Sequence, residues 1–218
     1  MKTFPSSTFP TIRARTSLLL FHTVLTCLIV GCGGQKFSGV EEYKQLTKRA
    51  SAAVENAVRS LENVSAPSGR PASKLIANFE RDLQRLQVDS MQVRARARAI
   101  RARGDAYFAD WSENIANIKD PKVKAAAVNS RPQIEAAFNQ IKLASQQAGA
   151  AFDPFLSGLQ KLRVELELRP DAVTGGPGQE LARTTLDNGK QVLVVLAQIN
   201  SELQTLTTLL TSGKTAAQ

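Results

Sequence analysis

The side chains with the most reactive chemistry lie near the N-terminus. The chain of 218 residues contains two cysteines, Cys27 and Cys32, and one histidine, His22. Beyond Cys32 there is therefore no thiol or imidazole for a Ser-His or Cys-His nucleophile, or for the usual zinc coordination sphere. Carboxylate pairs such as Glu165 and Glu167 are two residues apart, which on a helix turns them away from each other. We expect no enzyme activity, no metal and no cofactor.

The first 31 residues have the pattern of a secretory signal. Residues 1–15 carry three basic and no acidic side chains, and residues 16–31 are uncharged and mostly apolar. The apolar run is shorter than the about 20 residues that a membrane-spanning helix needs. We therefore predict that residues 1–31 are removed. The mature chain would then hold 25 basic and 19 acidic residues, a net charge of +6.

The end of the apolar run, Leu28-Ile29-Val30-Gly31-Cys32, resembles a bacterial lipobox. The resemblance implies a diacylglyceryl thioether on the Cys32 sulfur, cleavage after Gly31 and acylation of the new amine. Two or three acyl chains are enough for stable membrane anchoring. Gly33 is not an aspartate, which in enterobacteria-like sorting favours the outer membrane. The alternative is an ordinary signal peptide, or an uncleaved anchor, in which the cysteine occurs by chance.

Apolar and small residues recur at alternating steps of three and four along most of the remaining chain, which predicts long helices packed along a seam. Clusters of Gly, Pro and Ser separate the helical segments. The fold class predicted from these patterns is all-α, an elongated antiparallel bundle or coiled coil of about four long helices. The expected helices cover residues 38–64, 73–119, 130–168 and 179–211.

Local signals set the expected boundaries. Ser38-x-x-Glu41 and Ser130-x-x-Gln133 have the form of capping boxes, so we expect helices to begin there. Asp120 should cap a short helix over Pro121–Val128. Pro154 interrupts the third seam without changing its phase, which predicts a kink. The expected organisation is a signal over 1–31, a tether over 32–37, the helical domain over 38–211 and a disordered tail over 212–218.

Five arginines crowd the centre of the second helix. With Ala97 and Ile100 on the seam, heptad positions place four of the five beside it, where long stems cover apolar surface and seek carboxylates. An antiparallel partner helix would bring Phe152 and Phe155 opposite, so arginine stems could lie over phenylalanine rings. The five arginines are Arg94, Arg96, Arg98, Arg101 and Arg103.

The alternative interpretation is a polyanion-binding patch. Exposed arginines attract anionic lipid head groups or acidic envelope polymers. The charge also fits nucleic acid, but the signal sequence and the lack of a recognised nucleic-acid module disfavour that partner. Tyr107 and Trp111, one and two turns beyond the run, are interpreted as core residues or else as a partner contact. Gly104 would allow close helix approach beside them.

The aromatic segment with Tyr107, Phe108 and Trp111 and the motif Phe152-x-Pro154-Phe155-Leu156 carry a family resemblance. Together with the lipobox, the leucine-rich stretch 159–168 and the turn at Ala172-Val173, they resemble a family of bacterial lipoproteins known as domain of unknown function 2959. The resemblance implies a helical, membrane-tethered envelope protein with no catalytic residues to carry over. The arginine run departs from that family, whose members are acidic through much of the first half of the chain.

These observations predict a membrane-anchored lipoprotein that faces the periplasm and acts as a structural, spacer or adaptor bundle. Its partners would be the membrane, through the lipid on Cys32, and an unknown envelope protein or a second copy of the chain. The alternative function is polyanion binding through the arginine run.

Overall fold

The computed structural model describes residues 32–66 and 71–215, with side chains for 39–66 and 71–211. Contacts divide the chain into two units, Met1–Phe37 and Ser38–Gln218, of which the second contains the bundle. The predicted signal peptide lies outside the described residues. None of the described helices is long and apolar enough to span a membrane.

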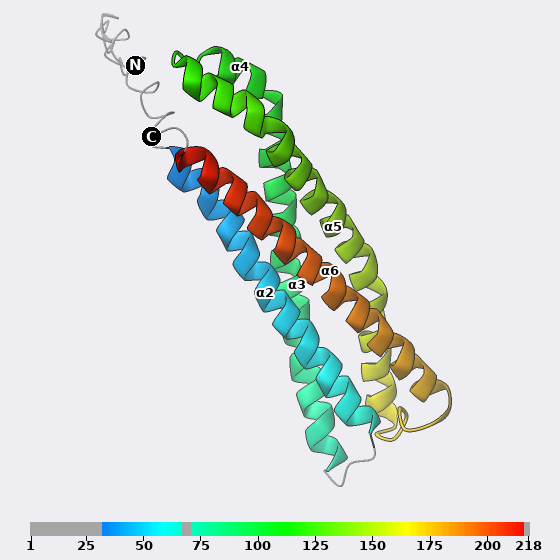
Figure 1. The fold of residues 1–218 in the computed structure, drawn as a ribbon. Helices are drawn as coiled ribbons and strands as arrows, with labels where there is room; N and C mark the ends of the chain where they lie inside the picture. Colours follow the sequence, from blue (N-terminus) through cyan, green and yellow to red (C-terminus); the bar gives the residue numbers. More distant parts are fainter. Residues whose placement is uncertain (1–31, 67–70, 216–218) are drawn as a thin grey trace, which may run out of the picture. The chain divides into compact units, whose positions relative to one another are not determined.

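Every element in the described part of the chain is helical, as the heptad patterns predicted. Four long helices form the bundle, and a short helix follows the second of them (Figure 1). In chain order the helices are α2 (Cys32–Ser65), α3 (Ala72–Ala109), α4 (Trp111–Ala116), α5 (Pro121–Leu168) and α6 (Gly176–Thr215).

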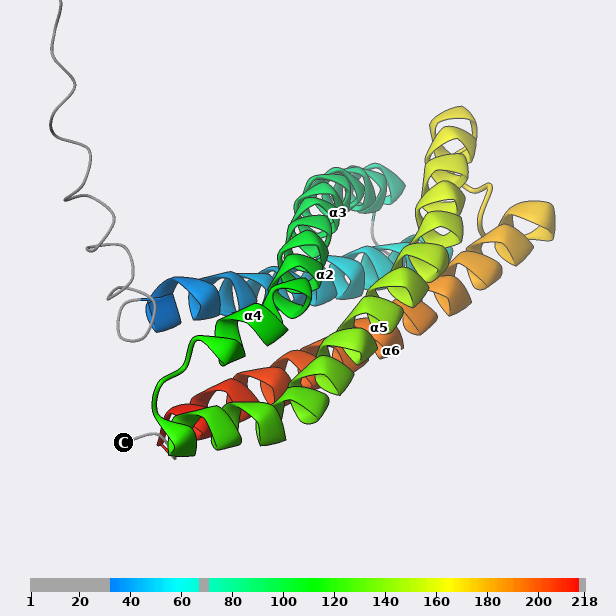
Figure 2. The same cartoon turned by 90° about the horizontal axis from the view of Figure 1, so that it is seen from above.

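Contacts between helices fix their directions. Ser60 donates a hydrogen bond to Asp82 and Arg96 pairs with Glu42, so α2 and α3 are antiparallel. In the α3–α5 pair and in the α5–α6 pair, the contacting residues also run in opposite order along the two helices, so these pairs are antiparallel as well. Helix α6 also packs antiparallel to α2, because Thr47 donates to Asn200 at 2.6 Å while Val58 lies against Gly189. Figures 1 and 2 show the long helices α3, α5 and α6 and their short connections.

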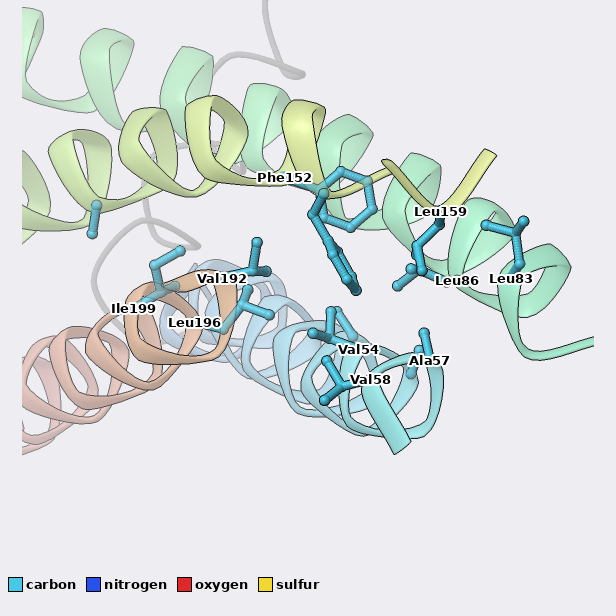
Figure 3. Packing of buried hydrophobic residues seen from close by; sticks show 14 of the residues in the cluster. Val54, Ala57, Val58, Leu83, Leu86, Phe152, Leu159, Val192, Leu196 and Ile199 are labelled. Atoms are coloured by element: carbon cyan, nitrogen blue, oxygen red, sulfur yellow. The ribbon is translucent and has the colours of Figure 1, made fainter. Parts of the chain in front are cut away.

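The predicted seams form the core. Every seam residue of α2 is buried, and α5 and α6 bury most of theirs. On α3 the seam is buried from Phe79 to Ser90, but Val93, Ala97 and Gly104 are only half-buried. Figure 3 shows Val54 from α2, Phe152 from α5 and Val192 from α6 extending towards one another in the middle of this core.

The helix boundaries show which local signals were misleading. Helix α2 begins at Cys32, so the predicted helix start at Ser38 was wrong, and residues 32–37, predicted as a tether, are helical. A Ser and a Glu three residues apart also fit inside a helix, so the capping-box form alone does not mark a helix start. Helix α6 extends to Thr215, so the tail predicted over 212–218 is helical in its first part, and residues 216–218 lie outside the described part.

The helix predicted over 73–119 is interrupted at Asp110. Asp110 is the last cap of α3 and the first of α4: its φ of −84° and ψ of −3° stay in the right-handed region, its N–H bonds to the Ala106 carbonyl at 3.1 Å, and α4 begins at Trp111. One residue of altered backbone hardly shifts a heptad pattern, which is why the sequence did not reveal the break.

Helix α5 is continuous where two helices were predicted. Asp120 caps it as expected, accepting hydrogen bonds from the N–H groups of Lys122 and Val123. The predicted start at Ser130 was wrong, because its hydroxyl donates to the Ala127 carbonyl at 3.1 Å, a bond made inside a helix. The helix continues through Pro154, and Figure 2 shows it changing direction in its yellow-green part.

Gly104 marks a close approach of α3 to α5. A Cβ atom on Gly104 would lie 1.9 Å from Cζ of Phe138, whose ring is buried and packs against Phe108 at 5.4 Å between centroids. The ring is therefore held from another side and has little room to move away. The glycine lets the two helices approach, as the sequence predicted.

We expect Gly104→Ala to lower the free energy of unfolding by about 1–3 kcal/mol, because it overpacks this contact. Gly149→Ala is the matched control, since a Cβ there meets no atom within 4 Å. The control should be neutral or stabilising by about 0.5–1 kcal/mol, as for alanine in place of glycine in a helix. Urea titrations of both variants measure the difference. Equal stability of the two would contradict the close approach.

Candidate functional site

The arginine run divides into side chains that face the neighbouring helices and side chains that face solvent. Arg96 and Arg101 are half-buried beside the seam, whereas Arg94, Arg98 and Arg103 are exposed. Of the three exposed arginines, Arg94 still contacts α5. The division follows from helical geometry, because residues spaced two apart cannot all face the same side of α3.

Arg94 connects α3 to α5. Its guanidinium forms an ion pair with Asp153 and lies 5.3 Å from the centre of the Phe152 ring. The predicted stacking of an arginine over Phe152 is therefore confirmed. The side chain of Arg94 keeps 43% of its surface exposed and that of Asp153 67%, so this ion pair is at the edge of the interface.

Arg96 connects α3 to α2. It forms an ion pair with Glu42, and its side chain is only 19% exposed. The buried Nε of Arg96 has no hydrogen-bond partner among the described residues. The stem thus covers the seam while the end of the guanidinium reaches a carboxylate, the arrangement that the heptad position predicted.

Arg101 is half-buried close to Tyr43 and Ser145. The Tyr43 hydroxyl and the Ser145 hydroxyl are hydrogen-bonded at 3.0 Å. Burial raises the pKa of Tyr43 above its ordinary value, while the bond to Ser145 and the positive charge of Arg101 act in the opposite direction. The Nε of Arg101 is buried and has no hydrogen-bond partner in the described structure.

Tyr107 and Trp111 join an aromatic cluster at the end of α3. Their rings meet edge to face at 5.0 Å, and Phe108 stacks on Trp111 at 5.9 Å. Trp111 is 6% exposed and therefore belongs to the core. Tyr107 is half-buried, and burial raises its pKa. The cluster connects α3 and α4 to α5 through Phe138.

Two cationic residues of α5 complete the site and were missed from the sequence. Arg131 lies 6.0 Å from the Trp111 ring, and Lys142 lies 5.6 Å from the Phe138 ring while pairing with Asp105 at 2.7 Å. The sequence around an isolated basic residue on a long helix does not predict such ring contacts and ion pairs, because the partners come from another helix.

The arrangement of these groups suits helix association. In the part that the structure describes, no group of three or more His, Cys, Asp and Glu side chains is placed to hold a metal ion. Cys32, the predicted lipidation site, is the first residue of α2, and its side chain lies outside the described part. The described contacts of the arginine run join α3 to α2 and α5.

We expect Arg96→Gln to destabilise the bundle by about 1 kcal/mol, because it removes a cross-helix ion pair and part of the stem that covers the seam. Arg98→Gln, two residues away and exposed, should change stability by less than about 0.5 kcal/mol. Chemical denaturation of both proteins provides the test. A larger loss in Arg98→Gln would contradict the assignment of packed and exposed positions.

The raised pKa of Tyr43 predicts a loss of stability in alkali. The unfolded chain ionises at the ordinary pKa of 10.0, before the folded chain does, so stability should fall as the pH rises above about 10. Tyr43→Phe should lessen this fall while retaining the fold. Thermal melts between pH 8 and roughly pH 11 measure it. An unchanged slope in the variant would show that Tyr43 does not contribute.

Comparison with known proteins places the chain in a family. The family described as "Protein of unknown function (DUF2959)" matches residues 36–173, which include α3, α4, α5 and nearly all of α2. No curated protein and no solved structure matches the chain. The matched region contains the arginine run, the aromatic cluster and the Pro154 segment. Because the match spans more than half of the sequence, the chain belongs to the DUF2959 family.

Proposed function

We propose that this protein is a lipoprotein anchored through Cys32 and acts as a structural, spacer or adaptor bundle in the bacterial cell envelope, on the periplasmic side of a membrane. The lipobox-like sequence at residues 28–32 supports the anchor. The proposal of a structural role rests on one observation. Within the arginine run, Arg94 and Arg96 pair with acidic residues on neighbouring helices.

The length of the helices suits a spacer. Helix α5 has 48 residues, which at 1.5 Å per residue corresponds to about 70 Å. Its buried residues extend over most of this length, from Ile134 to Leu166. A helix supported by neighbours along its length resists bending and can hold a partner at a fixed distance.

A polyanion-binding surface is the second candidate. Arg98 and Arg103 are exposed on α3, and Arg94 is partly so. Contacts of such residues with anionic lipid would contribute about 1 kcal/mol per arginine and weaken with salt. We favour the structural role, because the pairing of Arg94 and Arg96 leaves less free charge than the sequence suggested.

One experiment tests the anchor and separates the two candidates. The full-length protein and Cys32→Ser are expressed in a bacterium that processes lipoproteins, and membranes are washed at low and high salt. We expect wild type to stay in the membrane fraction at both salts, with a lipid-modified Cys32 in the mass spectrum of its N-terminal peptide. Cys32→Ser should be soluble or unprocessed.

Two results would contradict the proposal. An unmodified wild-type chain that still begins with Met1 would exclude the lipid anchor. A Cys32→Ser protein that binds membranes at low salt, and is released by high salt, would support polyanion binding instead, because that attraction is electrostatic and screened. Cys27→Ser is the matched control, since it changes the other thiol of the N-terminal segment and should behave as wild type.

A further inference from the structure

A cavity of about 70 Å³ lies between all four long helices and is partly open to solvent. Its walls include Val54 from α2, Val93 from α3, Phe152 from α5 and Leu196 from α6. Figure 3 shows Val54, Phe152 and Leu196 around this central region. The cavity has room for several waters, since a water needs roughly 10–15 Å³ by this measure, and a guest longer than the cavity would extend from its open side.

The cavity exists because small residues from neighbouring helices lie around the same part of the bundle. Ala50, Ser90, Ala97 and Ala148 come from three helices and occupy seam positions where the heptad pattern elsewhere has Leu, Ile or Phe. Small side chains make fewer van der Waals contacts across the core than large ones would. An apolar guest in this space would supply contacts that these residues do not make.

The walls of the cavity are mainly apolar, and its hydroxyl groups are already engaged. Tyr43 and Ser145 bond to each other, and Ser90 donates to the Gln87 carbonyl at 2.8 Å. Water bound there would thus find few free partners, whereas an aliphatic chain would contact the walls well. The guest favoured by this lining is apolar and slim.

One charged side chain, that of Arg94, lies in the wall of the cavity, and its positive charge determines which head group a guest would carry. Arg94 lines the cavity and holds its guanidinium over Phe152, with Asp153 as its only acidic partner among the described side chains. Asp153 is 67% exposed, so it can turn to solvent at little cost. A carboxylate at the end of an aliphatic chain could then take the place of Asp153 on Arg94, with charge-assisted hydrogen bonds.

We propose that this cavity binds a single-chain carboxylate amphiphile of the fatty-acid class, with part of the chain in the cavity between the four helices and the carboxylate on Arg94. The inference does not depend on the lipid anchor. Arg94 would then be a ligand-binding residue as well as a helix contact, and the ligand carboxylate would replace Asp153 as its partner.

The test compares octanoate with octan-1-ol, which has the same chain length and no charge. Binding to the full-length Cys32→Ser protein is measured by isothermal titration calorimetry; this variant excludes competition from a covalent lipid. We expect both probes to bind. Arg94→Gln should weaken octanoate by about tenfold, the loss of a charged hydrogen bond, and leave octan-1-ol unchanged.

The second part of the test fills the cavity with a larger side chain. Ala148→Leu should weaken both probes at least about tenfold, because the added side chain occupies their space. Ala150→Leu is the matched control on the exposed side of α5 and should bind as the parent protein does. Ala97→Leu fills the cavity from α3 and replaces Ala148→Leu if the latter fails to fold by circular dichroism.

Three results would overturn the proposal. The parent protein could fail to bind either probe at millimolar concentration. The filled variants could bind octanoate as the parent does, which would place the probe elsewhere. Equal weakening of octanoate and octan-1-ol by Arg94→Gln would show that the arginine does not hold the carboxylate. Each result is distinct from a failure of the Cys32 anchor, which is measured in membranes.

Discussion

Close helix approach at a few glycines is the constraint on which the bundle depends. Gly104 faces the Phe138 ring, Gly158 faces Thr185, and Gly189 lies against Val58 and Phe155; at each of these a Cβ atom would come within 3 Å of its neighbour. These contacts set the spacing of α3, α5, α6 and α2. The leucine and phenylalanine seams pack well only at that spacing, because side chains in a core interlock without room to adjust.

The charged residues form ion pairs at the edges of the same helix interfaces. Arg94 and Arg96 connect α3 to its two neighbours, and Lys142 pairs back to Asp105 on α3. Ion pairs at such half-exposed positions contribute little energy individually. Their greater effect is on specificity, since a shift of α5 by one turn would place Gly149 or Ser157 instead of Asp153 opposite Arg94. The run thus favours one register between α2, α3 and α5.

The cavity sits where the tight packing is relaxed. Below it, towards the turn between α5 and α6, Phe155, Leu159 and Leu162 are fully buried, and beyond it Ile141 and Leu203 are buried as well. Between these layers the small side chains of Ala50, Ser90 and Ala148 leave the space open. A bundle that is closely packed on both sides of one loose layer has a place for a guest without loss of the overall fold.

The periodicity of apolar residues determined the fold class and the seams, and the residues Asp120-Pro121 determined the helix cap, because burial of an apolar stripe and the bonding of free N–H groups are local requirements. The heptad positions also indicated that an arginine of the run would lie over a phenylalanine ring. It did not reveal the break at Asp110, the continuity of α5 across Ser130, the partners of Arg131 and Lys142, or the cavity. These features depend on which side chains meet across helices far apart in the sequence. Only the tertiary structure decides that, because it sets the level at which one helix lies against the next.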